Sequence, residues 1–196
     1  MKSIIGIVAI ALTFIAYVPY LRDLIKHKTK PHVFTWLVWA TVAIISFGLQ
    51  IQASAGIGAY VTLAAGIVCL AVFMIGLFQK TAKKNIKKVD IVFLIAALLA
   101  LIMWTVAKQP VVSVLMLCLV DSLGFVPTVR KSWDKPYTET LSTFAINVIR
   151  FILSVIALSD YNFVSTFYPA YWILANFLFC LMLIIRRKQF RKSRSS

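Results

Sequence analysis

The chain has 196 residues, of which 61% are hydrophobic, and its mean hydropathy is +0.90. A soluble domain is about half apolar and needs a polar coat, which this composition cannot supply. The formal net charge is +15, but no structured basic face with interleaved aromatic residues is visible, as nucleic-acid binding would require. The composition therefore excludes an ordinary soluble domain and predicts an integral membrane protein without a nucleic-acid partner.

Seven apolar runs are long enough to cross a bilayer, since a spanning helix needs about 20 predominantly apolar residues. They cover residues 4–21, 33–51, 57–78, 89–107, 110–129, 137–158 and 168–186. The runs are continuous rather than alternating, which favours helices over the strands of a membrane barrel. The first run lacks a clear small-x-small cleavage site, so we expect a retained helix rather than a signal peptide.

Basic residues gather in the connections on one side of the predicted helices. Of the 21 lysines and arginines, 18 lie in loops 22–32, 79–88 and 130–136 and in the tail from Arg186 onward. Lys2 and Lys108 lie on the other side, and Arg150 lies within a run. Short loops rich in Lys and Arg stay in the cytoplasm. The sequence therefore predicts a multi-pass protein of the cell membrane (plasma or inner membrane) with its N-terminus outside and its C-terminus cytoplasmic.

The basic tail has two interpretations. It can contact the anionic headgroups of the lipid bilayer, an attraction of about 1 kcal/mol per basic residue close to the surface. Alternatively, it serves only as the stop-transfer anchor of the last helix.

Two halves of the chain resemble each other. The matches are Val18, Pro19 and Arg22 with Val126, Pro127 and Arg130, then Lys30-Pro31 with Lys135-Pro136. In the third run of each half, YVTLAAGIVCL from position 60 aligns with YWILANFLFCL from position 171. Both copies place a basic loop after their first span, so both point the same way and a further span must lie between them. We therefore predict parallel three-helix repeats at 1–88 and 109–196, the second with the basic tail, joined by a linker transmembrane helix at 89–108.

This 3 + 1 + 3 plan, with a proline near the inner end of the first helix of each triplet, resembles the SWEET / PQ-loop transporter superfamily. The resemblance implies an all-α membrane transporter of a sugar or a similar small polar metabolite, working by alternating access. The sequence departs from the family pattern where Tyr20 and Thr128 replace the glutamine of the PQ dipeptide. It also has Ala65 where the first repeat would carry a pocket asparagine, whereas Asn176 fits that place in the second.

The resemblance also implies a proline tetrad of hinge or gate residues, and the matching positions are Pro19, Pro31, Pro127 and Pro136. Proline inside a spanning helix leaves the carbonyl four residues earlier without its hydrogen bond. The paired placement of Pro19 and Pro127 therefore favours hinges at a cytoplasmic gate. Pro31 and Pro136 have the simpler alternative of starting a helix, a position that proline favours.

Asp121 and Arg150 are the only charged residues deep in the predicted spans. A lone charge at the bilayer centre costs at least about 2.5–3.5 kcal/mol. Helical rise places the two at depths that differ by about 4 Å, so either they pair with each other or each faces a wet cavity. Asn147 shares a helix face with Arg150 and Asn176 could close the same cavity. The alternatives are an ion pair that only sets packing and a substrate-binding site formed by these four residues.

The first repeat has few polar residues at the equivalent places, which are Thr13, Val42, Ile45 and Ala65. The polar chemistry therefore lies almost wholly in the second repeat. Trp36 and Trp39 on the second span could form an aromatic wall for a ring-shaped ligand, and packing or interface anchoring is their alternative role.

Motifs of other chemistry are absent from the sequence. There is no nucleophile elbow, phosphate loop or paired-carboxylate motif, and no Cys/His pair has metal-ligand spacing. We expect that the protein is not an enzyme and that it has no metal, no cofactor and no disulfide. The predicted partners are a small-molecule substrate and the lipid bilayer, and homo-oligomerisation is left open.

The leading hypothesis is therefore a transporter of a small polar solute. Asp121 and Arg150 leave room for a charged or zwitterionic substrate or for proton coupling. The alternative is a membrane receptor or accessory protein that binds a ligand or peptide without moving it.

Overall fold

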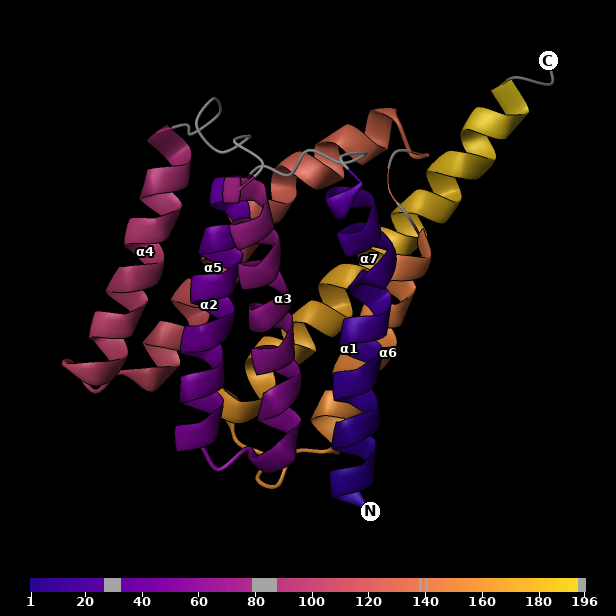
Figure 1. The fold of residues 1–196 in the computed structure, drawn as a ribbon. Coiled ribbons are helices and arrows are strands. Elements are labelled where there is room, and N and C mark those ends of the chain that lie inside the picture. The colour runs from indigo at the N-terminus through magenta and orange to yellow at the C-terminus, as the bar shows by residue number, and fades with distance from the viewer. Residues whose placement is uncertain (27–32, 79–87, 138, 140, 194–196) are drawn as a thin grey trace.

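The computed structural model describes residues 1–26, 33–78, 88–137, 139 and 141–193, except the side chains at 23, 89, 90, 127, 131, 192 and 193 (Figure 1). These residues form helices and no strand. The elements are α1 (Lys2–Ile25), α2 (Val33–Gln52), the 3-10 helix η1 (Gly56–Gly58), α3 (Ala59–Phe78), α4 (Lys88–Thr105), α5 (Pro110–Asp134), α6 (Leu141–Ile156) and α7 (Phe163–Ser193).

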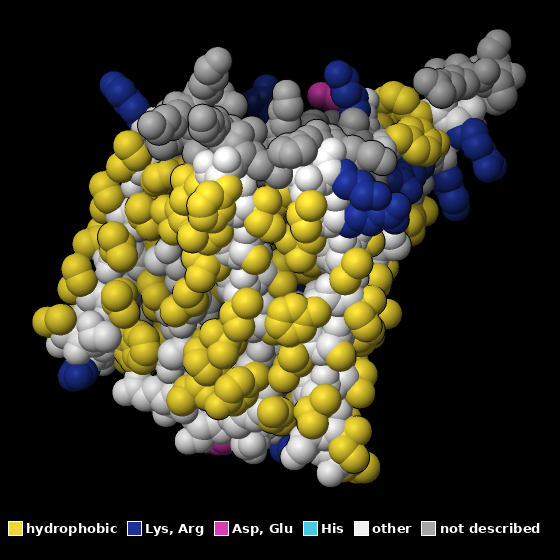
Figure 2. All heavy atoms as spheres, viewed as in Figure 1, with side chains coloured by type: hydrophobic (Ala, Val, Ile, Leu, Met, Phe, Trp, Pro, Cys, Tyr) yellow, Lys and Arg dark blue, Asp and Glu magenta, His cyan; other side chains and the backbone are white. Residues whose placement is uncertain are grey.

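Among the described residues, five segments are long and apolar enough to cross a membrane, namely α1, α2, η1 with α3, α5 and α7. α4 and α6 contribute shorter apolar helices, Ile91–Thr105 and Leu141–Ile156. Large apolar side chains such as Ile4, Leu119 and Leu174 are exposed, and Figure 2 shows hydrophobic atoms over the lateral face of the bundle. An apolar exterior of this extent suits lipid rather than water. The described part of the chain is thus all-helical, and its long apolar helices are consistent with the multi-pass membrane protein that the composition predicts.

The two ends of the bundle carry different connections (Figure 1). Met1 and the connections α2–α3, α4–α5 and α6–α7 lie at one end, which we call the N-terminal face. The α5–α6 connection and the end of α7 lie at the other, the C-terminal face. The hydrogen bonds that join segments at the N-terminal face include Ser159 N to Ala55 O (2.9 Å), Asn162 Nδ2 to Ala53 O (2.9 Å) and Lys2 Nζ to Leu158 O (2.6 Å).

The helices pair in a repeated pattern. α1 and α2 both pack on α3, and α5 and α6 both pack on α7. Between these two triplets, α1 packs on α6 and α2 packs on α5. α4 lies at the margin of the bundle, where it packs on α5 and α2 around buried Ala97 and Ala100 (Figure 1).

The triplets approach each other closely where η1 meets α6. Ser154 Oγ donates a hydrogen bond to the Gly58 carbonyl oxygen over 2.9 Å. A Cβ at position 58 would lie 2.5 Å from the Ser154 carbonyl oxygen. Glycine therefore permits this backbone contact between the two triplets, and a larger residue would force them apart.

α7 begins at Phe163, five residues before the predicted start of the seventh span. Asn162 caps it, because its Oδ1 accepts a hydrogen bond from Ser165 N (3.0 Å) and its own backbone N–H donates to Ser165 Oγ (3.0 Å). These reciprocal bonds form a capping box, which satisfies two otherwise unpaired backbone donors of a helix start. The five added residues place Tyr168 inside the helix rather than at its first position.

α7 also contains Pro169, which has no backbone N–H to donate to the carbonyl of Ser165. Gln50 of α2 replaces that donor, since its Nε2 donates to the Ser165 carbonyl oxygen over 3.3 Å. Both Gln50 and Ser165 are buried. The break in one helix is thus compensated by a side chain from the other triplet.

This compensation predicts that Gln50→Leu costs more stability in the parent chain than in a Pro169→Ala background. Alanine restores the helical donor to Ser165, so the carbonyl no longer depends on Gln50. The difference between the two costs should be about 0.5–3 kcal/mol, the range of contacting pairs in double-mutant cycles. Thermal unfolding of the four proteins in one detergent measures it, and an equal cost in both backgrounds would contradict the coupling.

α6 begins at Leu141, so the prediction that the sixth span starts at 137 is wrong. α5 ends at Asp134, just before Lys135-Pro136, as expected because the residue before a proline disfavours the helical conformation. Arg187 of α7 holds the segment that follows: its Nε donates to the Pro136 carbonyl oxygen (3.0 Å) and its Nη2 to that of Glu139 (2.6 Å). These carbonyls are satisfied by a side chain, and the helix starts after them.

Candidate functional site

Asp121 lies on α5 with only 2% of its surface exposed. Its carboxylate accepts two hydrogen bonds from α7: Tyr168 Oη donates over 2.8 Å and Trp172 Nε1 over 3.2 Å. Both bonds end on the same oxygen, Oδ2, so neither uses Oδ1. The two donors are uncharged and lie one helical turn apart, which fixes the carboxylate against α7 without neutralising it.

Arg150 lies on α6 and is 3% exposed. Its Nε donates to Asn147 Oδ1 over 2.7 Å, and its Cζ lies 4.1 Å from the centre of the Phe151 ring. Its Nη1 is buried without a hydrogen-bond partner among the described residues. Because an N–H donor of a buried charged group is costly to leave unpaired, this nitrogen marks unused binding capacity.

Asp121 and Arg150 do not form an ion pair in the described structure, so the first alternative from the sequence is wrong. Near-equal depth does not make them pair, because Asp121 bonds to side chains of α7 and Arg150 bonds to Asn147 of its own helix. An aromatic pair connects the two instead. Trp172, which binds Asp121, stacks on Phe151 with ring centres 6.3 Å apart and an interplanar angle of 8°. The two charges therefore share one centre without neutralising each other.

The first triplet also reaches this centre. The Tyr17 side chain of α1 lies near Asn147 and Arg150. Cys69 of α3 is buried and lies near Asp121 and Arg150. We call Asp121, Asn147, Arg150, Tyr168 and Trp172 the polar centre, and it lies where the two triplets meet.

Trp36 and Trp39 belong to an aromatic cluster with Tyr17 and Tyr20. Ring centres lie 5.3 Å apart for Trp36–Trp39, 5.1 Å for Tyr20–Trp36 and 6.4 Å for Tyr17–Trp36. The two tryptophans stand near the start of α2, toward the C-terminal face (Figure 1). They adjoin the polar centre through Tyr17, and they also pack α1 on α2.

The second triplet has an aromatic cluster of its own, which the sequence did not predict. Phe125, Phe144 and Phe179 come from α5, α6 and α7, with ring centres 5.0 Å apart for Phe125–Phe179 and 4.4 Å for Phe144–Phe179. Phe125 follows Tyr17 by 108 residues and Phe144 follows Trp39 by 105, the offsets of the sequence repeat. Equivalent helix positions thus carry aromatic rings in both halves.

Asn176 lies on the same face of α7 as Tyr168 and Trp172. It is 1% exposed, and its Nδ2 donates to the Trp172 carbonyl oxygen over 2.7 Å. The sequence predicted Asn176 but missed Tyr168 and Trp172, which hold Asp121. Their spacing of four residues from one another and from Asn176 was a readable signal, because such residues share a helix face.

The four prolines take different positions. Pro19 lies within an uninterrupted α1 and is exposed on its outer surface. α5 continues through position 127, whose side chain is outside the described structure, as is all of Pro31. Pro136 is buried in the α5–α6 connection and does not start α6. None of the described prolines contacts the polar centre through a hydrogen bond or ring.

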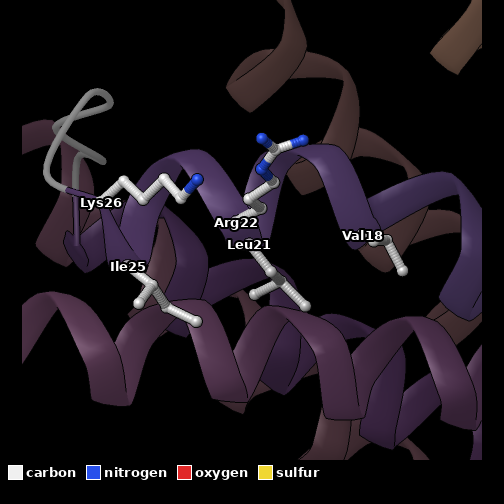
Figure 3. A pocket seen from close by; sticks show the side chains of 5 residues that line it. All are labelled: Val18, Leu21, Arg22, Ile25 and Lys26. Carbon is white, nitrogen blue, oxygen red and sulfur yellow. The ribbon is translucent and has the colours of Figure 1, made fainter.

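A shallow pocket of about 340 Å³ lies elsewhere, at the C-terminal end of α1 (Figure 3). Val18, Leu21 and Ile25 point to one side of the helix and Arg22 and Lys26 to the other. Apolar residues next to basic ones are typical of a helix end at a membrane surface, where long basic side chains keep their charge in water.

The part of the chain that the structure describes holds no group of three or more His, Cys, Asp or Glu able to bind a metal. The three cysteines, Cys69, Cys118 and Cys180, are free. No protein-family model, curated protein or solved structure matches this chain. The chemistry of the polar centre is therefore the basis for assigning a function.

Proposed function

We propose that the protein transports a small polar solute across the plasma or inner membrane by alternating access of two three-helix bundles. The observation that carries the proposal is the Arg150 guanidinium, buried where the triplets meet and left with an unpartnered Nη1. Such a group lowers stability unless something binds to it. A polar solute held between the triplets would supply the missing partner.

The packing of the helices supports the two-bundle architecture and the resemblance to the SWEET / PQ-loop superfamily. A two-fold axis along the membrane normal would relate α1 to α5, α2 to α6 and α3 to α7. The α1–α6 contact would then be equivalent to the α5–α2 contact, and both are present. We assign residues 1–88 and 109–196 to the bundles and 89–108 to the linker helix, with α4 and α6 as the two shorter of seven spans.

The proposed orientation places the C-terminal face in the cytoplasm. Its described basic residues include Arg22, Arg130, Arg186 and Arg187, and Figure 2 shows Lys and Arg gathered along that edge. The basic α7 end would meet anionic headgroups there. A reporter fused after Ser196 should therefore read cytoplasmic, while a cysteine introduced at Asp160 should react with an impermeant thiol reagent on intact cells. Reaction only after permeabilisation would contradict the orientation.

Flux into proteoliposomes tests transport. The purified protein should give saturable uptake of at least one labelled sugar, amino acid, nucleoside or vitamin, and Arg150→Gln should abolish it. Arg130→Gln is the matched control, because it removes an exposed arginine outside the polar centre and should leave uptake intact. Ligand binding without flux would favour the receptor alternative.

A further inference from the structure

The polar centre holds one acid and one base that do not neutralise each other. Asp121 is bound by the uncharged donors Tyr168 and Trp172, and Arg150 by the uncharged Asn147. No ion pair to either one occurs within the described residues. Buried charges without counter-charges are strongly disfavoured, so a ligand that offsets both gains more than one that offsets a single charge.

We infer that the solute is a zwitterion with one carboxylate and one ammonium group, of which an α-amino acid is the simplest example. This inference rests on the proposed function, because it names the substrate class of the same site. The carboxylate binds Arg150 at Nη1, and the ammonium group binds Asp121 at Oδ1.

Charge balance selects this class over the alternatives. A monocarboxylate would pair with Arg150 but leave Asp121 unbalanced and the site net negative. A simple amine would do the reverse, and a neutral sugar would leave both charges uncompensated. A zwitterion gives each buried charge a partner and keeps the net charge of the site at zero.

The hydrogen bonds already present leave the required atoms available. Tyr168 and Trp172 both use Asp121 Oδ2, so its other oxygen has no bond from them. Asn147 fixes the Nε edge of the Arg150 guanidinium, and Phe151 lies against it. The Nη1 donor is thereby oriented in advance, which lowers the ordering cost of binding. Asn147 is a positioning residue in this arrangement.

Titration calorimetry on the full chain in detergent tests the inference without any mutation. The probes are the individual L-amino acids, with glucose as the neutral comparison. For the tightest binder, two analogues follow: the amine formed by removing its carboxylate, and the acid formed by removing its ammonium group. Each analogue should bind about 10- to 100-fold more weakly, since charge-assisted hydrogen bonds contribute about 1.5–3 kcal/mol.

Variants then assign each charge to its partner. Arg150→Gln should weaken binding of the amino acid and the acid without weakening that of the amine. Asp121→Asn should weaken binding of the amino acid and the amine without weakening that of the acid. Arg130→Gln and Asp134→Asn alter exposed residues of the same types and should change nothing.

The outcomes separate the inference from the proposed function. If an analogue lacking one charge binds as tightly as its parent, or no amino acid binds, the inference is overturned. Saturable flux of glucose without amino-acid binding also overturns the zwitterion inference, but it agrees with the proposed transport function. Amino-acid binding with the expected charge dependence but without flux supports the inference and refutes transport.

Discussion

Arg150→Met is expected to stabilise the folded protein while abolishing uptake. The substitution removes a buried guanidinium that has an unpartnered nitrogen and no counter-charge within the described structure. Hydrophobic replacement of buried ionic groups is often neutral or stabilising, by about 1–4 kcal/mol. The change also removes the donor to Asn147 Oδ1, which offsets part of this gain. Thermal unfolding in detergent and proteoliposome flux measure the two effects.

Arg130→Met provides the control, since Arg130 is exposed and its loss should alter neither stability nor uptake appreciably. If Arg150 were instead half of a buried ion pair, its removal would strand the partner and cost about 3–5 kcal/mol. A clear drop in the unfolding midpoint of Arg150→Met would therefore contradict the unpaired state described above.

Asp121→Leu is expected to destabilise the protein far more than Asp121→Asn. Leucine leaves the Tyr168 hydroxyl and the Trp172 indole N–H without an acceptor, at about 1–3 kcal/mol for each buried donor. Asparagine keeps an acceptor oxygen at the same place. Uptake should be lost in both variants, whereas the unfolding midpoint should separate them.

A partial rescue sharpens this test. Tyr168→Phe removes one of the two stranded donors, so adding it to Asp121→Leu should recover part of the lost stability. In the parent chain the same substitution should be destabilising, because Asp121 then loses a hydrogen bond. Equal stability of Asp121→Leu and Asp121→Asn would mean that the α7 donors do not depend on the carboxylate.

The sequence was most informative where the controlling interactions are local. Apolar runs of spanning length predicted the helical membrane bundle, because lipid leaves a chain few other ways to satisfy its backbone. The start of α7 was also readable in principle, since Asn162 and Ser165 form a capping box three residues apart. The start of α6 was not readable, because Arg187, some fifty positions later, satisfies the carbonyls of Pro136 and Glu139.

For the candidate site, the sequence likewise predicted part of the structure, namely which residues are buried, but not their hydrogen-bond partners. Burial of Asp121, Asn147, Arg150 and Asn176 followed from their depth in the apolar runs, and all four are buried. Partner choice did not follow, because depth along a helix says nothing about rotation around it, and each residue turns the direction by about 100°. Asn147 binds Arg150 from the helix face that their spacing predicts. The donors to Asp121, Tyr168 and Trp172, were not foreseen, and of the two alternatives for Asp121 and Arg150 the ion pair is wrong.

A backbone hydrogen bond at the N-terminal face closes the bundle between its two triplets. The backbone N–H of Ser159, in the connection between α6 and α7, donates to Ala55 in the connection between α2 and α3. A hydrogen-bonded amide exchanges with deuterium only when its bond opens. Separation of the triplets at this face would break that bond. The deuterium uptake rate at Ser159 would therefore report how often the face opens, without a covalent probe or a substrate.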